Sequence, residues 1–358
     1  MTYGDIFIIS LSFFMAMRTD DFDYILPNEL IAQQPCVTRD HSRMMVVDRT
    51  TGQIECRHFF DLHDFLKGGD VVTVNDSKVI PARLYGKKAT GGVIEILLLA
   101  RPGTTHRWEV LLRPAKRLSV GMKIYFGTDA WAEVQERLSD KKWVLDFHTD
   151  RPFEEFLTAY GSAPLPPYIK RKKGNSHYGD DLERYQTIYA RHPGSVAAPT
   201  AGLHFAPGTL EALKRRNIAT APVTLHVGYG TFLPVEAERV EDHRVEREWF
   251  EVTNGTADTI NSADRVVAVG TTAVRTLETL SDARGMLIPG TGQTDLFIYP
   301  GYRFKIVDAL LTNFHLPRSS LFLLVCAFAG RDLMLEAYER AVRERFRFYS
   351  YGDCMLIL

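Results

Sequence analysis

Residues 266–275 have the sequence Val-Val-Ala-Val-Gly-Thr-Thr-Ala-Val-Arg, and this segment decides the fold class. It predicts a strand, a glycine turn and the start of a helix, with Thr271 or Thr272 capping the helix. Free N–H groups at such a helix start favour a carboxylate or a phosphate. Because the segment is not GxGxxG, it does not support a dinucleotide site or an ordinary methyltransferase Rossmann site.

Arg275 and Glu278 follow on the same predicted helix. They are one turn apart, so both side chains could reach one pocket. The alternative is a plain capped helix with an Arg–Glu pair at the surface, and the residues alone leave the two interpretations even.

The same α/β pattern recurs on both sides of the chain's middle. Residues 70–75 predict a strand buried on both faces, and Asn75-Asp76 puts polar groups at its carboxyl end, where open α/β sheets bind ligands. Further strands are predicted at 44–48, 223–227 and 265–269, and helices at 26–34, 152–160, 209–216, 273–280 and 332–346.

Residues 82–150 differ, because short strand-like runs recur there between turn signals. The runs are 83–87, 93–100, 107–112, 122–126, 130–137 and 143–147. Such spacing is typical of a small antiparallel barrel. We therefore predict a mixed α/β domain formed by residues 20–81 and 151–358, with an inserted small antiparallel β-barrel domain at 82–150.

Residues 1–19 precede the patterned sequence as an N-terminal extension. The apolar run from Ile6 to Met17 is too short to span a membrane and follows no Lys or Arg, so it does not resemble a signal peptide. Our leading interpretation is a mis-set start codon, with Met17 as the true start. An added N-terminal strand or helix is the alternative.

Composition narrows the function classes. A chain of 358 residues favours two domains, and a net charge of −1 means that nucleic acid would have to bind at local basic patches. The strongest patch is Lys170, Arg171, Lys172 and Lys173, for which a solvated loop is the alternative interpretation. Four cysteines without a CxxC pair argue against a disulfide framework and a cysteine zinc site.

Two glycine-rich stretches each contain one histidine. The first, 197–205, holds Gly202 and His204, and the second, 226–232, begins at His226. Small residues allow a ligand to approach the backbone closely. A lone histidine is usually a hydrogen-bonded core residue, but two of them beside glycine-rich backbone favour a binding site.

Three further segments combine charge, imidazole and aromatic rings. Residues 242–248 contain His243, residues 312–317 contain Asn313, Phe314 and His315, and residues 346–353 interleave aromatic residues with arginine. Such aromatic residues could stack bases, and helix-end packing is the alternative. A charged surface strand is the alternative for 242–248. No HExxH, GxSxG, Walker A or zinc spacing occurs.

At these residues the sequence resembles the S-adenosylmethionine:tRNA ribosyltransferase-isomerase family of queuosine biosynthesis. The matching stretches cover nearly the whole chain from Asp20 and are 21–24 (DFDY), 30–33 (LIAQ), 75–84 (NDSKVIPARL), 164–171 (PLPPYIKR), 185–187 (YQT), 196–205 (VAAPTAGLHF), 223–232 (VTLHVGYGTF), 269–278 (VGTTAVRTLE), 294–302 (TDLFIYPGY), 312–317 (TNFHLP) and 349–358 (YSYGDCMLIL). Ser77-Lys78 replaces the family's usual Thr-Arg. Glu246 replaces the second histidine of its His-x-Met-His-x-Glu motif, which puts a proton-transfer role at that position in doubt.

The resemblance implies an α/β domain with an inserted barrel, and it implies a reaction. The ribosyl part of S-adenosylmethionine is transferred to, and isomerised on, 7-aminomethyl-7-deazaguanine at the wobble position of tRNA. Epoxyqueuosine-tRNA forms, and adenine and methionine leave. S-adenosylmethionine is a co-substrate, and no tightly bound cofactor, metal or membrane is expected. We expect a cytoplasmic monomer.

This chemistry needs a base for the C5′–H beside the sulfonium, an acid for the departing adenine and a neutral attacking amine. The candidates are His204, His226, His243 and His315, with Asp76, Glu246 and Glu278 behind them; no step can be assigned to one of them. The methionine carboxylate suits Thr271, Thr272 and Arg275, and the sulfonium suits Tyr229 or Phe314.

The predicted substrate-binding set is Asn75, Arg83, Gly202, Gly228, Tyr229, Gly230, Thr231, Thr271, Thr272, Arg275, Asn313 and Phe314. The predicted tRNA-binding set is Lys170, Arg171, Lys172 and Lys173, with Arg113, Lys116 and Arg117 as further candidates. Two rival functions are another S-adenosylmethionine enzyme, such as a methyltransferase, and a non-catalytic RNA-binding protein.

Overall fold

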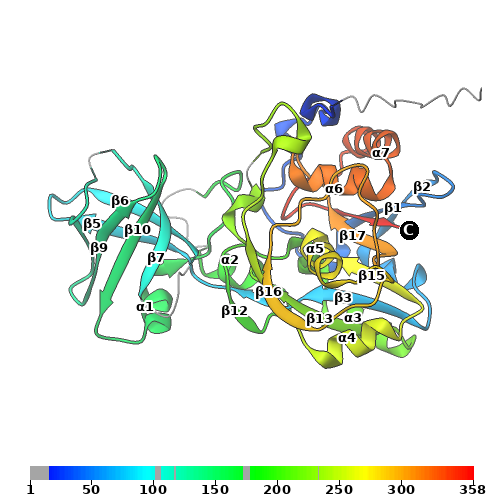
Figure 1. The fold of residues 1–358 in the computed structure, drawn as a ribbon, viewed down its shortest axis with the longest axis horizontal. Helices are drawn as coiled ribbons and strands as arrows, with labels where there is room; N and C mark the ends of the chain where they lie inside the picture. Colours follow the sequence, from blue (N-terminus) through cyan, green and yellow to red (C-terminus); the bar gives the residue numbers. More distant parts are fainter. Residues whose placement is uncertain (1–15, 101–105, 117, 172–177, 233) are drawn as a thin grey trace, which may run out of the picture.

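The computed structural model describes residues 16–100, 106–116, 118–171, 178–232 and 234–358. Residues 1–15 of the predicted extension, and the predicted tRNA contacts Lys172 and Lys173, lie outside the described residues. The chain folds into a barrel and a larger α/β part, which lie side by side in Figure 1. The fold class predicted from the sequence is confirmed.

The α/β part is built on a nine-stranded mixed sheet. Its order is β16-β14-β13-β3-β15-β17-β18-β1-β2, with β3 pairing in parallel with both β13 and β15. The strands are β1 (Arg43–Val47), β2 (Ile54–His58), β3 (Asp70–Asn75), β13 (Ala219–Leu225), β14 (Glu248–Val252), β15 (Arg265–Val269), β16 (Gly290–Thr294), β17 (Ala309–Asn313) and β18 (Cys354–Ile357).

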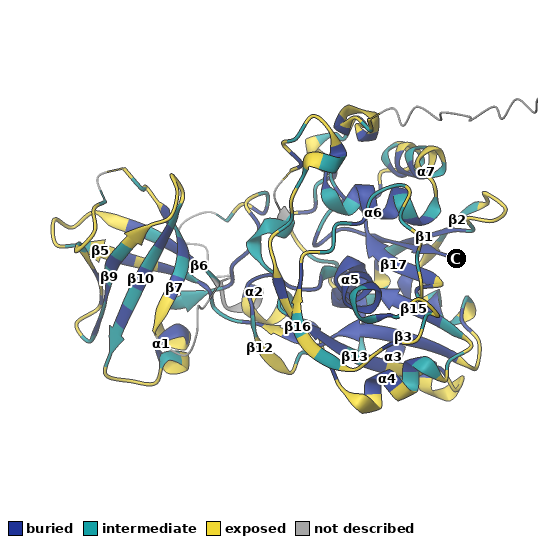
Figure 2. Cartoon of the chain, in the orientation of Figure 1, coloured by how far each residue is buried: buried dark blue, intermediate teal, exposed yellow. Residues whose placement is uncertain are grey.

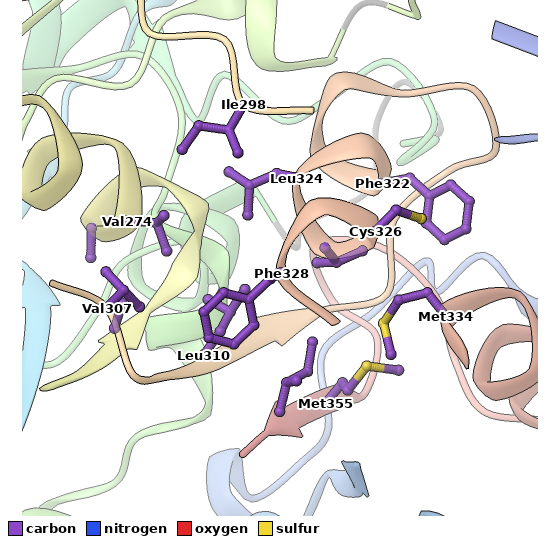
Figure 3. Close-up of a cluster of buried hydrophobic side chains, with 14 of the residues drawn as sticks. Val274, Ile298, Val307, Leu310, Phe322, Leu324, Cys326, Phe328, Met334 and Met355 are labelled. Carbon is purple, nitrogen blue, oxygen red and sulfur yellow. The ribbon is translucent and has the colours of Figure 1, made fainter. Parts of the chain in front are cut away.

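Helices cover both faces of this sheet, so its central strands are buried throughout. Val71 of β3 packs in the cluster that contains α4 to α7, whereas Val72 and Val74 pack in the cluster that contains α3. Figure 2 shows the buried centre, and Figure 3 shows the side chains around α6. The helices are α3 (Pro207–Arg215), α4 (Asn254–Asn261), α5 (Gly270–Leu280), α6 (Ser320–Ala329) and α7 (Arg331–Arg343).

The second sheet closes into a barrel because its first and last long strands, β5 and β8, pair with each other. The strand bounds are β5 (Arg83–Lys88), β6 (Val93–Ala100), β7 (Arg107–Arg113), β8 (Lys123–Phe126), β9 (Ala130–Arg137) and β10 (Lys142–Thr149). Helix α1 (Phe153–Tyr160) also belongs to the barrel's core, through Phe156 and Leu157. The exact division of the chain at 82 and 150 stays a prediction.

Short elements join the two parts. Strand β4 (Ser77–Val79) pairs in parallel with β12 (His192–Ser195), and β11 (Gly161–Ser162) pairs with the start of β5. The chain therefore enters and leaves the barrel at neighbouring points. Helix α2 (Tyr178–Arg184) follows the proline-rich linker at 162–171.

Three local predictions are corrected by the structure. Residues 26–34 form only a 3-10 turn at Asn28–Leu30, because the backbone of Leu30 and Ala32 bonds instead to Phe348. Strand β13 ends at Leu225 rather than at residue 227. Helix α5 begins at Gly270 with Val269 as its N-cap, so neither Thr271 nor Thr272 caps it.

Candidate functional site

A pocket lies at the carboxyl ends of β15 and β17, the edge where α/β sheets bind ligands. We call it the threonine pocket. Its lining includes Gly270, Thr271 and Thr272 from the first turn of α5, and Thr312, Asn313, Phe314 and His315 from the end of β17. Residues 197–201 of the first glycine-rich stretch also line it. The predicted helix start and the predicted histidine segment thus meet in one place.

A hydrogen-bond network fixes Asn313 in this pocket. Its Oδ1 accepts a hydrogen bond from Thr200 Oγ1 at 2.9 Å, so its Nδ2 faces His204 Nε2 at 3.1 Å. Because an amide nitrogen only donates, Nε2 accepts, and the proton of His204 lies on Nδ1, 2.7 Å from Ser42 Oγ. Burial, with Arg347 and Arg39 nearby, lowers the pKa of His204 to about 3. His204 is therefore a neutral support for Asn313 near neutral pH.

His315 lines the same pocket but is nearly enclosed. Its Nε2 lies 3.0 Å from Thr312 Oγ1, and burial lowers its pKa to about 3. A neutral imidazole of such low basicity is suited to hydrogen bonding rather than to holding a proton.

Two tyrosines also line the threonine pocket. The rings of Tyr168 and Tyr349 meet edge to face with centroids 3.9 Å apart, and the backbone of Tyr349 has a φ of 76°. A bulky residue in this left-handed region is strained, and such residues concentrate at functional sites.

A second pocket, the arginine pocket, contains a buried ion pair. The Arg275 guanidinium pairs with the Glu248 carboxylate, and both residues are at most 7% exposed. Glu248 Oε1 also accepts a hydrogen bond from Gly228 N at 2.8 Å, while Arg275 Nε has no hydrogen-bond partner among the described residues. The pair can present one negative and one positive group to a ligand.

His243 is the histidine of the arginine pocket, and it is half-buried there beside Phe297. Burial, followed by the charge of Arg244, lowers its pKa. Glu246, which stands in place of the second motif histidine, lines the same pocket and pairs with Lys142 of the barrel. Its carboxylate is therefore already engaged by a cation.

The two pockets adjoin, because Thr231 and Leu321 line both of them. Gly228 and Gly230 line the arginine pocket, and a Cβ at Gly230 would lie 3.1 Å from the end of the Glu246 side chain. Together the pockets form one composite site across the ends of β15 and β17.

Asp76 and His226 lie in a different cluster. Asp76 Oδ1 accepts a hydrogen bond from Thr224 at 2.7 Å, and its Oδ2 lies 3.6 Å from His192 Nε2. Burial raises the pKa of Asp76 and lowers the pKa of His226, whose ring lies against Trp249. The structure does not bring His204, His226 and Arg275, all predicted site residues, into one pocket.

Other predicted residues are occupied by internal contacts. Asn75 binds the backbone of Leu225 and Ser77, and Glu278 accepts hydrogen bonds from the backbone of residues 305–307. Gly202 is required because Tyr189 occupies the position that a Cβ would take. The Phe314 ring packs in the core against Tyr338, so its face is not presented to a ligand.

The aromatic segment 346–353 divides between two roles. Phe346 and Phe348 have no exposed surface and pack in the core, which excludes base stacking by these two rings. Tyr349 and Ser350 line the threonine pocket.

The remaining predicted residues lie near the barrel. Arg83 pairs with Glu95, and Arg171 donates to both carboxylate oxygens of Asp181, each at 2.8 Å. Tyr229, Arg83 and Arg171 line a third cavity between the barrel and the linker, whereas Lys170 is exposed. The guanidinium of Arg171 therefore already forms an ion pair with Asp181, with which a phosphate would have to compete.

Glu248 was missed as a site residue, although the sequence places it in the charged segment 242–248. Tyr168 and Thr200 were also missed, because only the fold brings their segments to the pocket. Within the described ranges there is no cluster of three or more possible metal ligands, and no helix there is both long enough and apolar enough for a bilayer.

The chain is similar to known proteins along almost its full length. The sequence model of the family described as queuosine biosynthesis protein matches residues 19–357. A protein of Syntrophus aciditrophicus named S-adenosylmethionine:tRNA ribosyltransferase-isomerase is 55% identical over 361 residues, covering 96% of this chain and all of that protein. A protein of the same name from Moorella thermoacetica is 52% identical, with 96% and 100% covered.

A solved structure is also similar. It is the crystal structure of S-adenosylmethionine tRNA ribosyltransferase from Thermotoga maritima, with 39% sequence identity and a TM-score of 0.52. The match covers 94% of this chain and all of that one.

Proposed function

Since the chain belongs to the queuosine biosynthesis protein family, we propose that it transfers and isomerises the ribosyl part of S-adenosylmethionine onto 7-aminomethyl-7-deazaguanine in tRNA. The products are epoxyqueuosine-tRNA, adenine and methionine. The observation that carries the proposal is the match along nearly the whole chain to relatives named for this transfer.

The arginine pocket suits the methionine end of the donor. An α-amino acid carries a carboxylate and an ammonium, which are complementary to Arg275 and Glu248 respectively. The N-terminal turn of α5 lines the adjoining threonine pocket and adds donors for negative charge there. The sulfonium would then lie near the two tyrosines of that pocket, since cations favour aromatic faces.

His243 is our candidate for proton transfer. It lines the site, remains partly open to solvent and does not have its ring nitrogens committed to the described residues by a hydrogen bond. His204 and His315 suit positioning, because burial keeps both neutral. Asp76 and His226 stay as alternatives for a second proton-transfer group, at a separate cluster.

The tRNA is proposed to approach from the side of the linker and barrel, where Lys170 is exposed and Arg113 lies at the end of β7. We place the enzyme in the cytoplasm, where its tRNA substrate is found, and propose that it acts as a monomer with S-adenosylmethionine as co-substrate. We propose no tightly bound cofactor and no metal.

One experiment separates this function from its rivals. The enzyme is incubated with donor labelled in the ribose and with tRNA carrying the precursor base, and the nucleosides are analysed by mass. Ribose label in the modified nucleoside together with free adenine is expected. Label transferred only from the donor methyl group would indicate a methyltransferase, and tRNA binding without adenine release would indicate a non-catalytic RNA-binding protein.

A further inference from the structure

The largest of the three cavities lies outside the composite site. It has a volume of about 490 Å³, against about 50 and 80 Å³ for the threonine and arginine pockets. We call it the barrel cavity, because strands β5, β6 and β7 form one wall and the linker at 162–171 forms the other. Nothing in the proposed donor chemistry uses this space.

One part of the barrel cavity's lining is apolar and aromatic, beside charged side chains. Side chains of Leu97 and Leu111 from the barrel face the linker residues Leu165, Pro166 and Ile169. Tyr85, which is 48% exposed, and Tyr229 also line the cavity. A planar heterocycle fits such a lining, because every base has a face that stacks on aromatic rings.

The charges inside the cavity are already neutralised. Arg83 pairs with Glu95 and donates to Leu165 O at 2.7 Å, and Arg171 pairs with Asp181. These pairs leave the cavity floor with no net charge from its arginines. They supply polar edges to a neutral group such as a base, and they do not attract a free anion into the interior.

The cavity's rim has a different electrostatic character. Arg113 at the end of β7 and Lys141 just before β10 both line the cavity and are exposed. Neither forms an ion pair or a side-chain hydrogen bond with the described residues. Two such cations beside a cavity with a partly apolar and aromatic lining are the arrangement that fits a phosphate at the opening and a base inside.

The cavity is also linked to the composite site by one short segment. Tyr229 lines the barrel cavity, while its neighbours Gly228 and Gly230 line the arginine pocket. An RNA strand with one nucleotide in the composite site can therefore place the neighbouring nucleotide in the barrel cavity, on the other side of residues 228–230.

We propose that the barrel cavity receives an unstacked nucleotide of tRNA next to the nucleotide being modified. Its base stacks against Tyr85, and its phosphate lies between Arg113 and Lys141. This inference rests on the proposed function, and it names a second recognition site on the same substrate. The barrel cavity would thereby recognise the nucleotide beside the modified base, while the reaction takes place in the composite site.

One variant of the cavity lining, compared with a matched control, tests the stacking. Tyr85→Ala removes one aromatic ring from the lining. The control is Tyr125→Ala, a barrel tyrosine that is 41% exposed and does not line the cavity. Loss of one stacking ring is expected to weaken binding of precursor tRNA by about 5- to 150-fold. The control variant and the dissociation constant for S-adenosylmethionine are expected to stay unchanged.

The rim is tested by Arg113→Ala combined with Lys141→Ala. The slope of log Kd against log salt is expected to fall by about 0.7 for each phosphate that the variant no longer neutralises. The matched control is Lys214→Ala combined with Arg215→Ala, which removes two exposed cations from α3.

Fluorescent 2-aminopurine placed at each nucleotide beside the wobble position supplies an independent readout. Quenching at one of these positions in the wild-type complex, and its loss in Tyr85→Ala, supports the proposal. Wild-type tRNA affinity and quenching in folded Tyr85→Ala and rim variants would overturn it, as would a selective loss of donor binding. If the wild-type enzyme itself neither binds tRNA nor releases adenine, the proposed function fails instead.

Discussion

Arg275 of helix α5 and Glu248 at the start of β14 form a buried ion pair in the arginine pocket. Their opposite charges explain why both can be buried, since an unpaired charge in the interior is costly. The carboxylate is further held by Gly228 N and by Thr231 Oγ1 at 3.4 Å. The segment that follows β13 is therefore tied to the helix start that lines the neighbouring pocket.

Removal of one partner is expected to be costly for the fold. Glu248→Gln leaves the Arg275 cation uncompensated and should lower the free energy of unfolding by about 3–5 kcal/mol. Adding Arg275→Gln should restore part of that loss. Urea unfolding of the two single variants and the double variant measures the coupling. Additive effects of the two changes would show that the pair does not interact.

An exposed pair provides the matched control. Arg215 and Glu211 on α3 lie 3.9 Å apart with 71% of each side chain exposed. Removing this pair should change the free energy of unfolding by less than about 1 kcal/mol, because solvent screens the charges.

The buried histidines predict how stability depends on pH. The pKa values of His204 and His315 are about 3 in the folded protein, below the ordinary value near 6.5. Between these values the unfolded chain binds more protons, so stability should fall as pH decreases from about 6.5 towards about 3. Each histidine contributes at most about 1.4 kcal/mol per pH unit.

Denaturant unfolding measured across this pH range tests the effect. His204→Gln should reduce the slope of the free energy of unfolding against pH by the contribution of one proton, at most about 1.4 kcal/mol per pH unit. Above pH 7 the difference in stability between variant and wild type should be constant. An unchanged slope in both His204→Gln and His315→Gln would contradict the assignment.

The pH dependence of turnover tests His243. If its neutral form accepts a proton, His243→Gln should reduce turnover by about 10²–10⁴ and remove the acid limb of the rate profile. Arg244→Ala should move that limb to higher pH, because Arg244 helps to lower the pKa of His243. An acid limb that persists in His243→Gln would assign the titration to another group.

The ion pair between Glu246 and Lys142 connects the α/β part to the barrel at the surface. Because 44% of the Glu246 side chain is exposed, Glu246→His should change stability by less than about 1 kcal/mol. Thermal unfolding at low and high salt measures this change. A larger loss that persists in high salt would show that the pair is not an ordinary exposed one.

Much of the fold follows from local pattern. The strands β3, β6, β9 and β15 have the bounds that the sequence predicts, because apolar runs and turn residues mark both of their ends. The segment 26–34 shows the limit of this reasoning. Its helical pattern is overridden by backbone hydrogen bonds to Phe348, a residue far along the chain.

The candidate site was predictable in its parts but not in its grouping. Residue type alone does not reveal that the Asn75 amide is used between strands, or that Glu278 holds the loop at 305–307. Nor does it reveal that the Phe314 ring turns to the core while its segment borders a pocket. These outcomes depend on partners distant in sequence, which only the folded chain supplies.

The adjacent entry and exit of the barrel have a consequence for the chain as a whole. Because β11 pairs with the first residues of β5, the two ends of the intervening segment are held together. Their separation at the α/β part is therefore fixed, whatever the length of that segment. The hydrogen bonds and packing of the barrel offset the entropy lost when this loop closes. The length of the inserted segment therefore has little effect on the register of β4 and β12. A chimaera that exchanges this barrel for that of a relative can therefore keep the central sheet intact.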